Sequence, residues 1–344
     1  MISFLLSVMF RISSLAQHIP SISYGILRVS SSISEQIYYF FLDSVGYRQD
    51  VRGKIALVTG SITGSITGSI TGSITGGITG TESSTPTDSV LTIEIVNKLL
   101  QKGIKVIAFV EESDQPATET LQQLSQLFPR TNTAFVTDTE SSGIQSPNLT
   151  LITLKNNDYC TSFDETYCAK YNDKKSGLGA SFKPDILILN HIMTDNSTLM
   201  NTEKSKMQEI VNKNFIATSS ITRCLIPDML AKEDGKIVYV DPIFDVYPSA
   251  FTMSLSKTGL QSITSSTRRE LSNHNINVSH IHVSTDRRSL KDDCKMIADA
   301  VTYCIEYRLR NYYTEPMVYI AYKKISTLIA NVTRSILKKV VRSV

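Results

Sequence analysis

The stretch Gly53-Lys-Ile-Ala-Leu-Val-Thr-Gly60 decides the fold, because it places a short apolar run between two glycines. Apolar runs of this length, rich in aliphatic residues, are typical of a strand buried on both faces of a parallel sheet. Residues 88–102 then show apolar side chains at helical spacing, and Gly103 ends this segment. The sequence therefore predicts a strand followed by a helix, which is the unit from which α/β folds are built.

The same alternation continues along the chain. Further strands are predicted at 105–110, 185–189, 236–240 and 278–283, and residues 134–136 and 149–154 are both candidates for the third strand. Helical periodicity lies between them, at 118–128, 205–230 and 254–271. This order predicts an α/β fold, a Rossmann-like doubly wound parallel sheet in a single domain, with ligands bound at the carboxyl ends of the strands.

Composition narrows the classes of function. The chain has 344 residues and a net charge of +3, and no basic block lies within its body. Nucleic acid is therefore not a predicted partner. The five cysteines show no Cys-x-x-Cys spacing, so the sequence predicts no metal site. The length fits one large domain, residues 51–290, with helical extensions at both ends.

The N-terminal extension, residues 1–50, is predicted to be a targeting or membrane-associating segment. Its first 34 residues contain Arg11 and Arg28 but no acidic residue. Three interpretations remain open: a mitochondrial presequence, an interfacial anchor, and a helix packed on the domain.

The C-terminal extension, residues 291–344, is predicted to end in a basic amphipathic helix from Tyr319 to Val344. Such a helix binds an anionic membrane surface or packs on the core with a solvated basic face, and the pattern does not separate the two. The ends of the chain thus make a membrane surface a predicted partner. We expect an intracellular protein at a mitochondrial or endoplasmic reticulum membrane, with the cytosol as the alternative.

Several motifs occur in a fixed order. They are Gly53–Gly60, Pro184-Asp-Ile-Leu-Ile-Leu-Asn190, Asn214-Phe215 followed by Pro227-Asp-Met229, Gly235-Lys-Ile-Val-Tyr-Val240, Ser254-Leu-Ser-Lys257, Arg269-Glu-Leu271 and Ile276-Asn-Val278. In this order and spacing they resemble the short-chain dehydrogenases/reductases over about residues 53–285. The resemblance implies a Rossmann domain of an oxidoreductase that uses NAD(P).

The resemblance also assigns site residues. Asn214 and Lys257 match two members of the family's catalytic set. The positions matching the cofactor site are Gly60, Gly64, Glu111, Asp138, Asn190 and Lys257. An acid at the end of the second strand would favour NAD over NADP, but Glu111 and Glu112 are better explained as solvated loop carboxylates. Asn157-Asp158 competes with Asp138 for the adenine-contacting position.

Two catalytic positions of the family are occupied by other residues. Met253 stands where the family has its proton-donating tyrosine, four residues before Lys257, and a thioether has no proton to give. Asp241-Pro242 stands where the family has a serine. An ionised Asp241 would repel the alkoxide that develops during carbonyl reduction.

The cofactor loop is altered as well. Gly60-Ser-Ile-Thr-Gly64 opens a tandem Ser-Ile-Thr-Gly repeat, and residues 61–87 are predicted to be an inserted polar loop. The loop lacks the closing Gly-x-Gly that lets backbone approach a pyrophosphate. The sixth strand runs into His282-Val-Ser-Thr285 instead of the family's Pro-Gly. NAD(P) remains the one cofactor implied, but this loop argues against a tight site.

The resulting prediction is a catalytically inactive member of this family that acts as a structural or interaction module. It would be membrane-associated and bind a protein partner or a second copy of itself as a homodimer. The alternative is an NAD(P)(H)-dependent oxidoreductase that acts on a lipid or other carbonyl or alcohol by diverged chemistry, and a third hypothesis is an NAD(H) sensor without turnover. His191, His280 and His282 are interpreted as core or rim histidines.

Overall fold

The computed structural model describes residues 48–62, 86–111, 133–136, 148–154, 183–190, 198–241, 251–283 and 290–314. The strands in this part of the chain are β1 (Ile55–Ile62), β2 (Lys105–Glu111), β3 (Thr133–Val136), β4 (Leu149–Leu154), β5 (Ile186–Leu189), β6 (Gly235–Val240), β7 (Ile276–His282) and β8 (Asn311–Tyr313). The helices are α2 (Pro86–Gln101), α6 (Lys204–Val211), the π-helical segment η3 (Asn212–Ala217), α7 (Thr218–Lys232), α8 (Phe251–Glu270) and α9 (Leu290–Tyr307).

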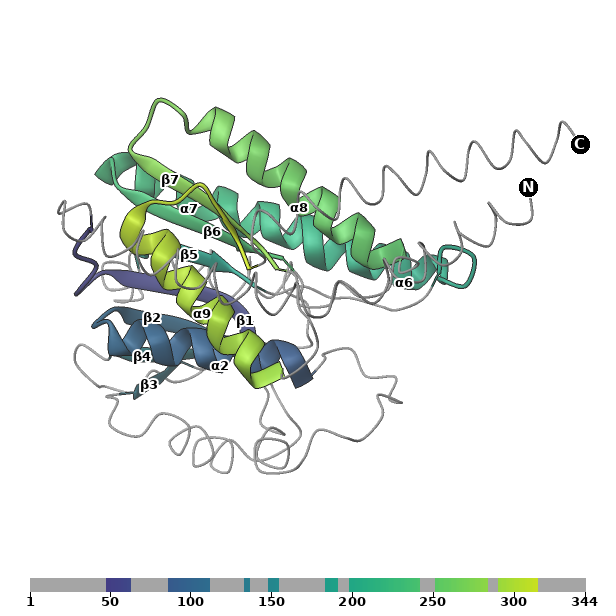
Figure 1. Ribbon diagram of the computed structural model, residues 1–344, viewed down its shortest axis with the longest axis horizontal. Coiled ribbons are helices and arrows are strands. Elements are labelled where there is room, and N and C mark those ends of the chain that lie inside the picture. Colours follow the sequence, from purple (N-terminus) through teal and green to yellow (C-terminus); the bar gives the residue numbers. More distant parts are fainter. Residues whose placement is uncertain are drawn as a thin grey trace, which may run out of the picture. The chain divides into compact units, whose positions relative to one another are not determined.

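These strands form one sheet in the order β3-β4-β2-β1-β5-β6-β7-β8, and every neighbouring pair is parallel. The predicted Rossmann-like doubly wound sheet is confirmed. Both candidates for the third strand are strands: β4 pairs with β2, and β3 adds to the outer side of β4. The described helices lie on the two faces of the sheet (Figure 1).

Side chains alternate between the two faces, as the two-residue period of a strand requires. Leu57, Phe109 and Tyr239 belong to the buried cluster that also holds side chains of α7 and α8. Helices α2 and α9 cover the opposite face of the sheet (Figure 1). Lys102, the residue after α2, forms a salt bridge of 2.8 Å from its Nζ to Glu306 Oε1 of α9. The sheet is thus covered on both sides, which explains its continuous apolar strands.

The sheet extends beyond residue 290, where the sequence predicted the domain to end. Helix α9 begins at Leu290, and β8 pairs with β7 in the register His280 to Asn311. The compact unit accordingly runs from Gln49 to Thr314. The predicted boundary falls too early because the apolar face of α9 belongs to this core, with Ile297, Val301 and Ile305 buried.

The predicted helix at 205–230 is formed by α6, η3 and α7 in succession. The π-helical segment holds Asn214, and π-bulges of this kind are frequent at functional sites. Helix α7 continues past Pro227 and ends at Lys232, where Glu233 takes a left-handed conformation with φ of 49°. Among the helices that the structure describes, none has the length and apolar character needed to cross a membrane.

Candidate functional site

The first half of the site is a hydrogen-bonded cluster where β1 and β5 end. The side-chain oxygen of Asn190 accepts a hydrogen bond from the Gly60 backbone N–H at 2.7 Å, and its Nδ2 donates to Thr92 Oγ1 at 3.0 Å. The Asn190 backbone N–H donates to Thr59 Oγ1 at 3.2 Å. The structure therefore brings together Gly60 and Asn190, two of the predicted cofactor residues.

Gly60 is required at this position for a packing reason. A Cβ built on it would lie 2.1 Å from Thr92 Oγ1 and 2.2 Å from Asn190 Nδ2. No side chain fits there, so the glycine allows β1, α2 and β5 to approach one another. The groups that lie close to Gly60 are the side chains of Thr92 and Asn190.

The other predicted cofactor residues are Gly64, Glu111, Asp138 and Lys257. Glu111 is the last residue of β2, at the carboxyl edge of the sheet. Gly64 and Asp138 lie outside the described residues, as does Pro242.

The second half of the site lies where η3 packs on α8. Asn214, which is fully buried, donates from Nδ2 to Ser256 Oγ at 2.6 Å, and Ser256 Oγ donates in turn to the Thr252 backbone oxygen at 2.8 Å. Lys257 donates from Nζ to the backbone oxygen of Val283 at 2.9 Å, just past the end of β7. The two predicted catalytic residues thus lie in one region, and each makes a hydrogen bond within the fold.

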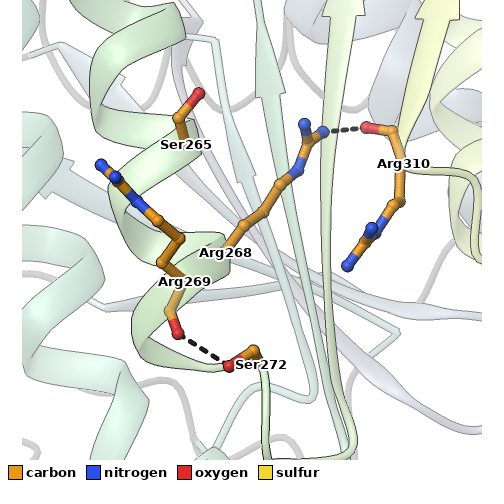
Figure 2. A pocket seen from close by; sticks show the side chains of 5 residues that line it. All are labelled: Ser265, Arg268, Arg269, Ser272 and Arg310. Carbon is orange, nitrogen blue, oxygen red and sulfur yellow. Dashed lines mark hydrogen bonds between the residues drawn. The ribbon is translucent and has the colours of Figure 1, made fainter.

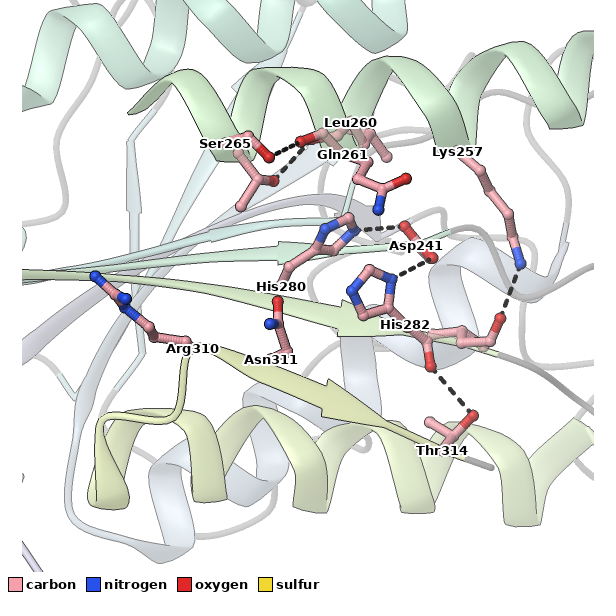
Figure 3. Close-up of polar contacts among 12 residues, drawn as sticks. Asp241, Lys257, Leu260, Gln261, Ser265, His280, His282, Arg310, Asn311 and Thr314 are labelled. Atoms are coloured by element: carbon pink, nitrogen blue, oxygen red, sulfur yellow. Dashed lines mark hydrogen bonds and ion pairs between the residues drawn. The ribbon is translucent and has the colours of Figure 1, made fainter. Parts of the chain in front are cut away.

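A cluster of one carboxylate and two imidazoles lies at the ends of β6 and β7 (Figure 3). Asp241 Oδ1 lies 2.6 Å from His280 Nε2, and Asp241 Oδ2 lies 3.6 Å from His282 Nδ1. His282 stacks on the ring of Tyr313 at a centroid distance of 4.5 Å. We refer to Asp241, His280 and His282 as the histidine–aspartate cluster. Its three side chains could hold a metal ion.

The charges in this cluster follow from burial and hydrogen bonding. Burial alone would raise the pKa of Asp241, but hydrogen bonds from His280 and His282 and the charge of Lys257 lower it to about 2. Burial lowers the pKa of His280, although Asp241 acts in the opposite direction. At neutral pH the arrangement is an ionised carboxylate that accepts a hydrogen bond from a neutral imidazole.

Sequence reasoning interprets the two histidines as core or rim residues and predicts no metal site. A signal for the cluster was nevertheless present. His280 and His282 are two residues apart in a predicted strand, so both project from the same face. Asp241 follows the neighbouring predicted strand, but only the register between β6 and β7 shows that it reaches the same face.

A basic hollow lies elsewhere in the domain, where α8 ends and β8 begins (Figure 2). It measures about 510 Å³ and is lined by Ser265, Arg268, Arg269, Ser272 and Arg310. Arg268 has a structural task there, because it donates from Nε to the Val278 backbone oxygen at 2.9 Å and from Nη2 to Asn311 Oδ1 at 3.0 Å. The hollow lies near the amino ends of β7 and β8, at the opposite edge from the histidine–aspartate cluster.

Comparison with known proteins supports the resemblance seen in the sequence. A family model described as short chain dehydrogenase matches residues 179–288. The human protein named Dehydrogenase/reductase SDR family member 7 is 32% identical over 92 residues, which are 26% of this chain and 27% of that protein. Ketoacyl reductase HetN from Nostoc sp. is 34% identical over 97 residues, 28% of this chain and 34% of that protein.

The chain thus spans about a third or less of the length of these relatives. Solved structures cover more of it. A short chain dehydrogenase/reductase family protein aligns with 78% of this chain and 98% of its own length, at a TM-score of 0.50 and 14% identity. An oxidoreductase of the same family from Burkholderia thailandensis aligns with 76% of this chain and 90% of its own length, also at a TM-score of 0.50 and 14% identity. The structures establish the fold, and the segment 179–288 is similar in sequence to the short chain dehydrogenases.

Proposed function

We propose that this chain, a relative of the short-chain dehydrogenases/reductases, does not carry out their hydride transfer and serves as a structural or interaction module. The observation that carries the proposal is the position of Asp241. This residue is the first after β6, 5% exposed, and its carboxylate faces both histidines of the histidine–aspartate cluster. A carbonyl reduced at this edge of the sheet would develop its negative charge next to a buried carboxylate, which is unfavourable.

The remaining polar groups support the same proposal. Lys257 and Asn214 are bonded to Val283 and Ser256, as described above. Helix α8 has Met253 one turn before Lys257, and a thioether cannot supply the proton that carbonyl reduction requires. The proton donor of the family therefore has no counterpart at that position of this chain.

The experiment that tests this proposal is a reductase assay on the purified full-length chain. NADH and NADPH are each offered with a panel of carbonyl substrates that includes a 3-oxoacyl thioester, and cofactor oxidation is followed by absorbance. We expect no oxidation above the protein-free background. A rate that is abolished by Lys257→Ala would refute the proposal, because it would show chemistry that depends on the retained lysine.

A second candidate function is an NAD(P)(H)-dependent oxidoreductase with diverged chemistry. The observation in its favour is that Asn214 and Lys257 lie together at the carboxyl edge of the sheet, where ligands of this fold bind. Ketoacyl reductase HetN is one of the proteins that are similar to part of this chain. This alternative requires a proton donor other than residue 253, and it requires that NAD(P) binds.

A cofactor titration separates the two functions before any substrate is known. NADH or NADPH is titrated into the full-length chain, and binding heat or cofactor fluorescence is followed. Micromolar affinity would favour the oxidoreductase or a nucleotide sensor without turnover. An absence of binding at millimolar cofactor would support the module. In that case we propose that the chain binds a protein partner, a second copy of itself, or a membrane through residues 1–50 and 315–344. Sedimentation with lipid vesicles tests whether it binds a membrane.

A further inference from the structure

We infer that the histidine–aspartate cluster, Asp241 with His280 and His282, is a binding site for a divalent transition-metal cation of the Zn²⁺ class. Its three ligand atoms lie within 4.8 Å of one another. The inference goes beyond the proposed function, because it requires neither a nicotinamide cofactor nor a carbonyl substrate.

The backbone places the three side chains on one face of the sheet. His280 and His282 are two residues apart in β7, so both project to the side covered by α8 (Figure 3). Tyr239 pairs with His280, and Asp241 stands two residues after Tyr239 on that same face. The Asp241 backbone N–H donates to the Ile281 oxygen at 3.0 Å, which continues the ladder one residue past β6. A sheet, and not a loop, therefore fixes the ligands, as a preorganised site requires.

The spacing of the ligand atoms suits one ion. Tetrahedral Zn²⁺ with bonds of about 2.0–2.1 Å separates its ligands by about 3.3 Å. The observed separations from the Asp241 oxygens, 2.6 Å to His280 Nε2 and 3.6 Å to His282 Nδ1, lie on either side of that value. Small side-chain rotations convert the hydrogen-bonded arrangement into a coordinated one.

The donor set selects the class of metal. Two imidazoles and one carboxylate suit Zn²⁺, Co²⁺, Ni²⁺ and Cu²⁺, whereas Mg²⁺ and Ca²⁺ prefer oxygen ligands. The side chains of His280 and Asp241 are 2% and 5% exposed, while that of His282 is 20% exposed. A cation would enter from the side of His282, and three protein ligands leave one position for a water molecule or another external ligand.

One nearby charge opposes the cation. The positive charge of Lys257 acts on Asp241, and its Nζ is fixed to Val283 at the same edge. A metal bound at the cluster would be repelled by this ammonium group, so removing the charge tightens binding. If the three residues form only a hydrogen-bond network, removing the charge of Lys257 has no metal affinity to change, so the effect distinguishes the two cases.

The test uses the full-length chain after treatment with a chelator. Zn²⁺ alone is titrated by calorimetry, and Co²⁺ alone is followed by its visible absorption, which is intense for tetrahedral sites. We expect binding at about one equivalent and a rise in Tm of about 5–10 °C at free Zn²⁺ near a hundred times the Kd. The variants His282→Phe and Asp241→Asn should each weaken Zn²⁺ binding by at least about 100-fold.

The variants are chosen so that folding does not decide the outcome. Phenylalanine keeps an aromatic ring against Tyr313, and asparagine keeps the shape of Asp241. His274→Ala is the matched control, because His274 is exposed in the turn before β7 and should leave binding unchanged. Lys257→Met should tighten binding several-fold. The inference is overturned if Zn²⁺ fails to bind, or if it binds equally well to His282→Phe, Asp241→Asn and the unmodified chain.

Discussion

The contact of η3 with α8 predicts a mutation whose effect changes sign with its background. Gly259 faces Phe215, and a Cβ built on Gly259 would lie 1.9 Å from Phe215 Cε1 and 2.4 Å from Cζ. Gly259→Ala therefore requires the ring or the helix to move by more than an ångström before an ordinary contact of 3.4–4 Å is restored. Overpacking of this kind costs about 1–3 kcal/mol.

Alanine in a helix is otherwise favoured over glycine by about 1 kcal/mol. In the unmodified chain the overpacking outweighs this gain, so Gly259→Ala should lower the free energy of unfolding by about 1 kcal/mol, within a range of about 0–2. In a Phe215→Ala background the ring is absent, and the same substitution should raise the free energy of unfolding by about 1 kcal/mol.

Equilibrium unfolding in urea, followed by far-UV circular dichroism for all four proteins, measures both values. The coupling between the two positions should be about 1–3 kcal/mol. The reasoning would be refuted if Gly259→Ala changed the free energy of unfolding by the same amount in both backgrounds. The result also bears on the site, because Asn214 adjoins Phe215 and reaches Ser256 only when η3 packs closely on α8.

Three further predictions concern buried polar groups. Burial, aided by the charge of Lys54, lowers the pKa of Lys236 from 10.5 to about 8. Since the unfolded chain keeps this proton up to a higher pH, the free energy of unfolding should rise by up to about 3 kcal/mol between pH 8 and 10.5. Urea titrations across this pH range should show the rise in the unmodified chain and not in Lys236→Met. Asn190→Ala leaves the Gly60 N–H without its acceptor and should lower the free energy of unfolding by about 1–3 kcal/mol. Asn190→Asp keeps an acceptor and should lower it by less, and thermal unfolding of the two variants compares them. Burial raises the pKa of Cys304 to about 12, so iodoacetamide should modify it only as the domain unfolds, and equal labelling of native and unfolded protein in peptide maps would contradict this.

The fold could be predicted from sequence because its strands are buried on both faces. Runs such as 186–189 and 237–240 carry no charged residue and are hydrophobic throughout, and the helices between them keep their periodicity. The end of the domain could not be predicted in the same way. Helix α9 and the three-residue β8 follow the last family motif, and only the pairing of β8 with β7 shows that they complete the sheet.

The candidate site was predicted in part for a related reason. Gly60, Asn190, Asn214 and Lys257 were found through motifs, and such motifs specify local backbone and not the partners of a side chain. That Asn190 accepts from Gly60 depends on β1 and β5 being neighbours, although 130 residues separate them in sequence. Register between distant strands is a property of the whole sheet, so periodicity within one segment does not contain it.

The histidine–aspartate cluster could not be predicted from the sequence, because it too depends on the register between two strands. In the sequence, Asp241 stands out only as a residue that cannot replace the family's serine, since a carboxylate donates no hydroxyl proton. Once β6 and β7 are in register, Asp241 is half of a hydrogen bond with His280 and faces His282 as well. A buried carboxylate without partners would be costly to the fold, and the two imidazoles offset that cost. The three residues therefore depend on one another, so changing Asp241 alone to serine should destabilise the domain before it restores any chemistry.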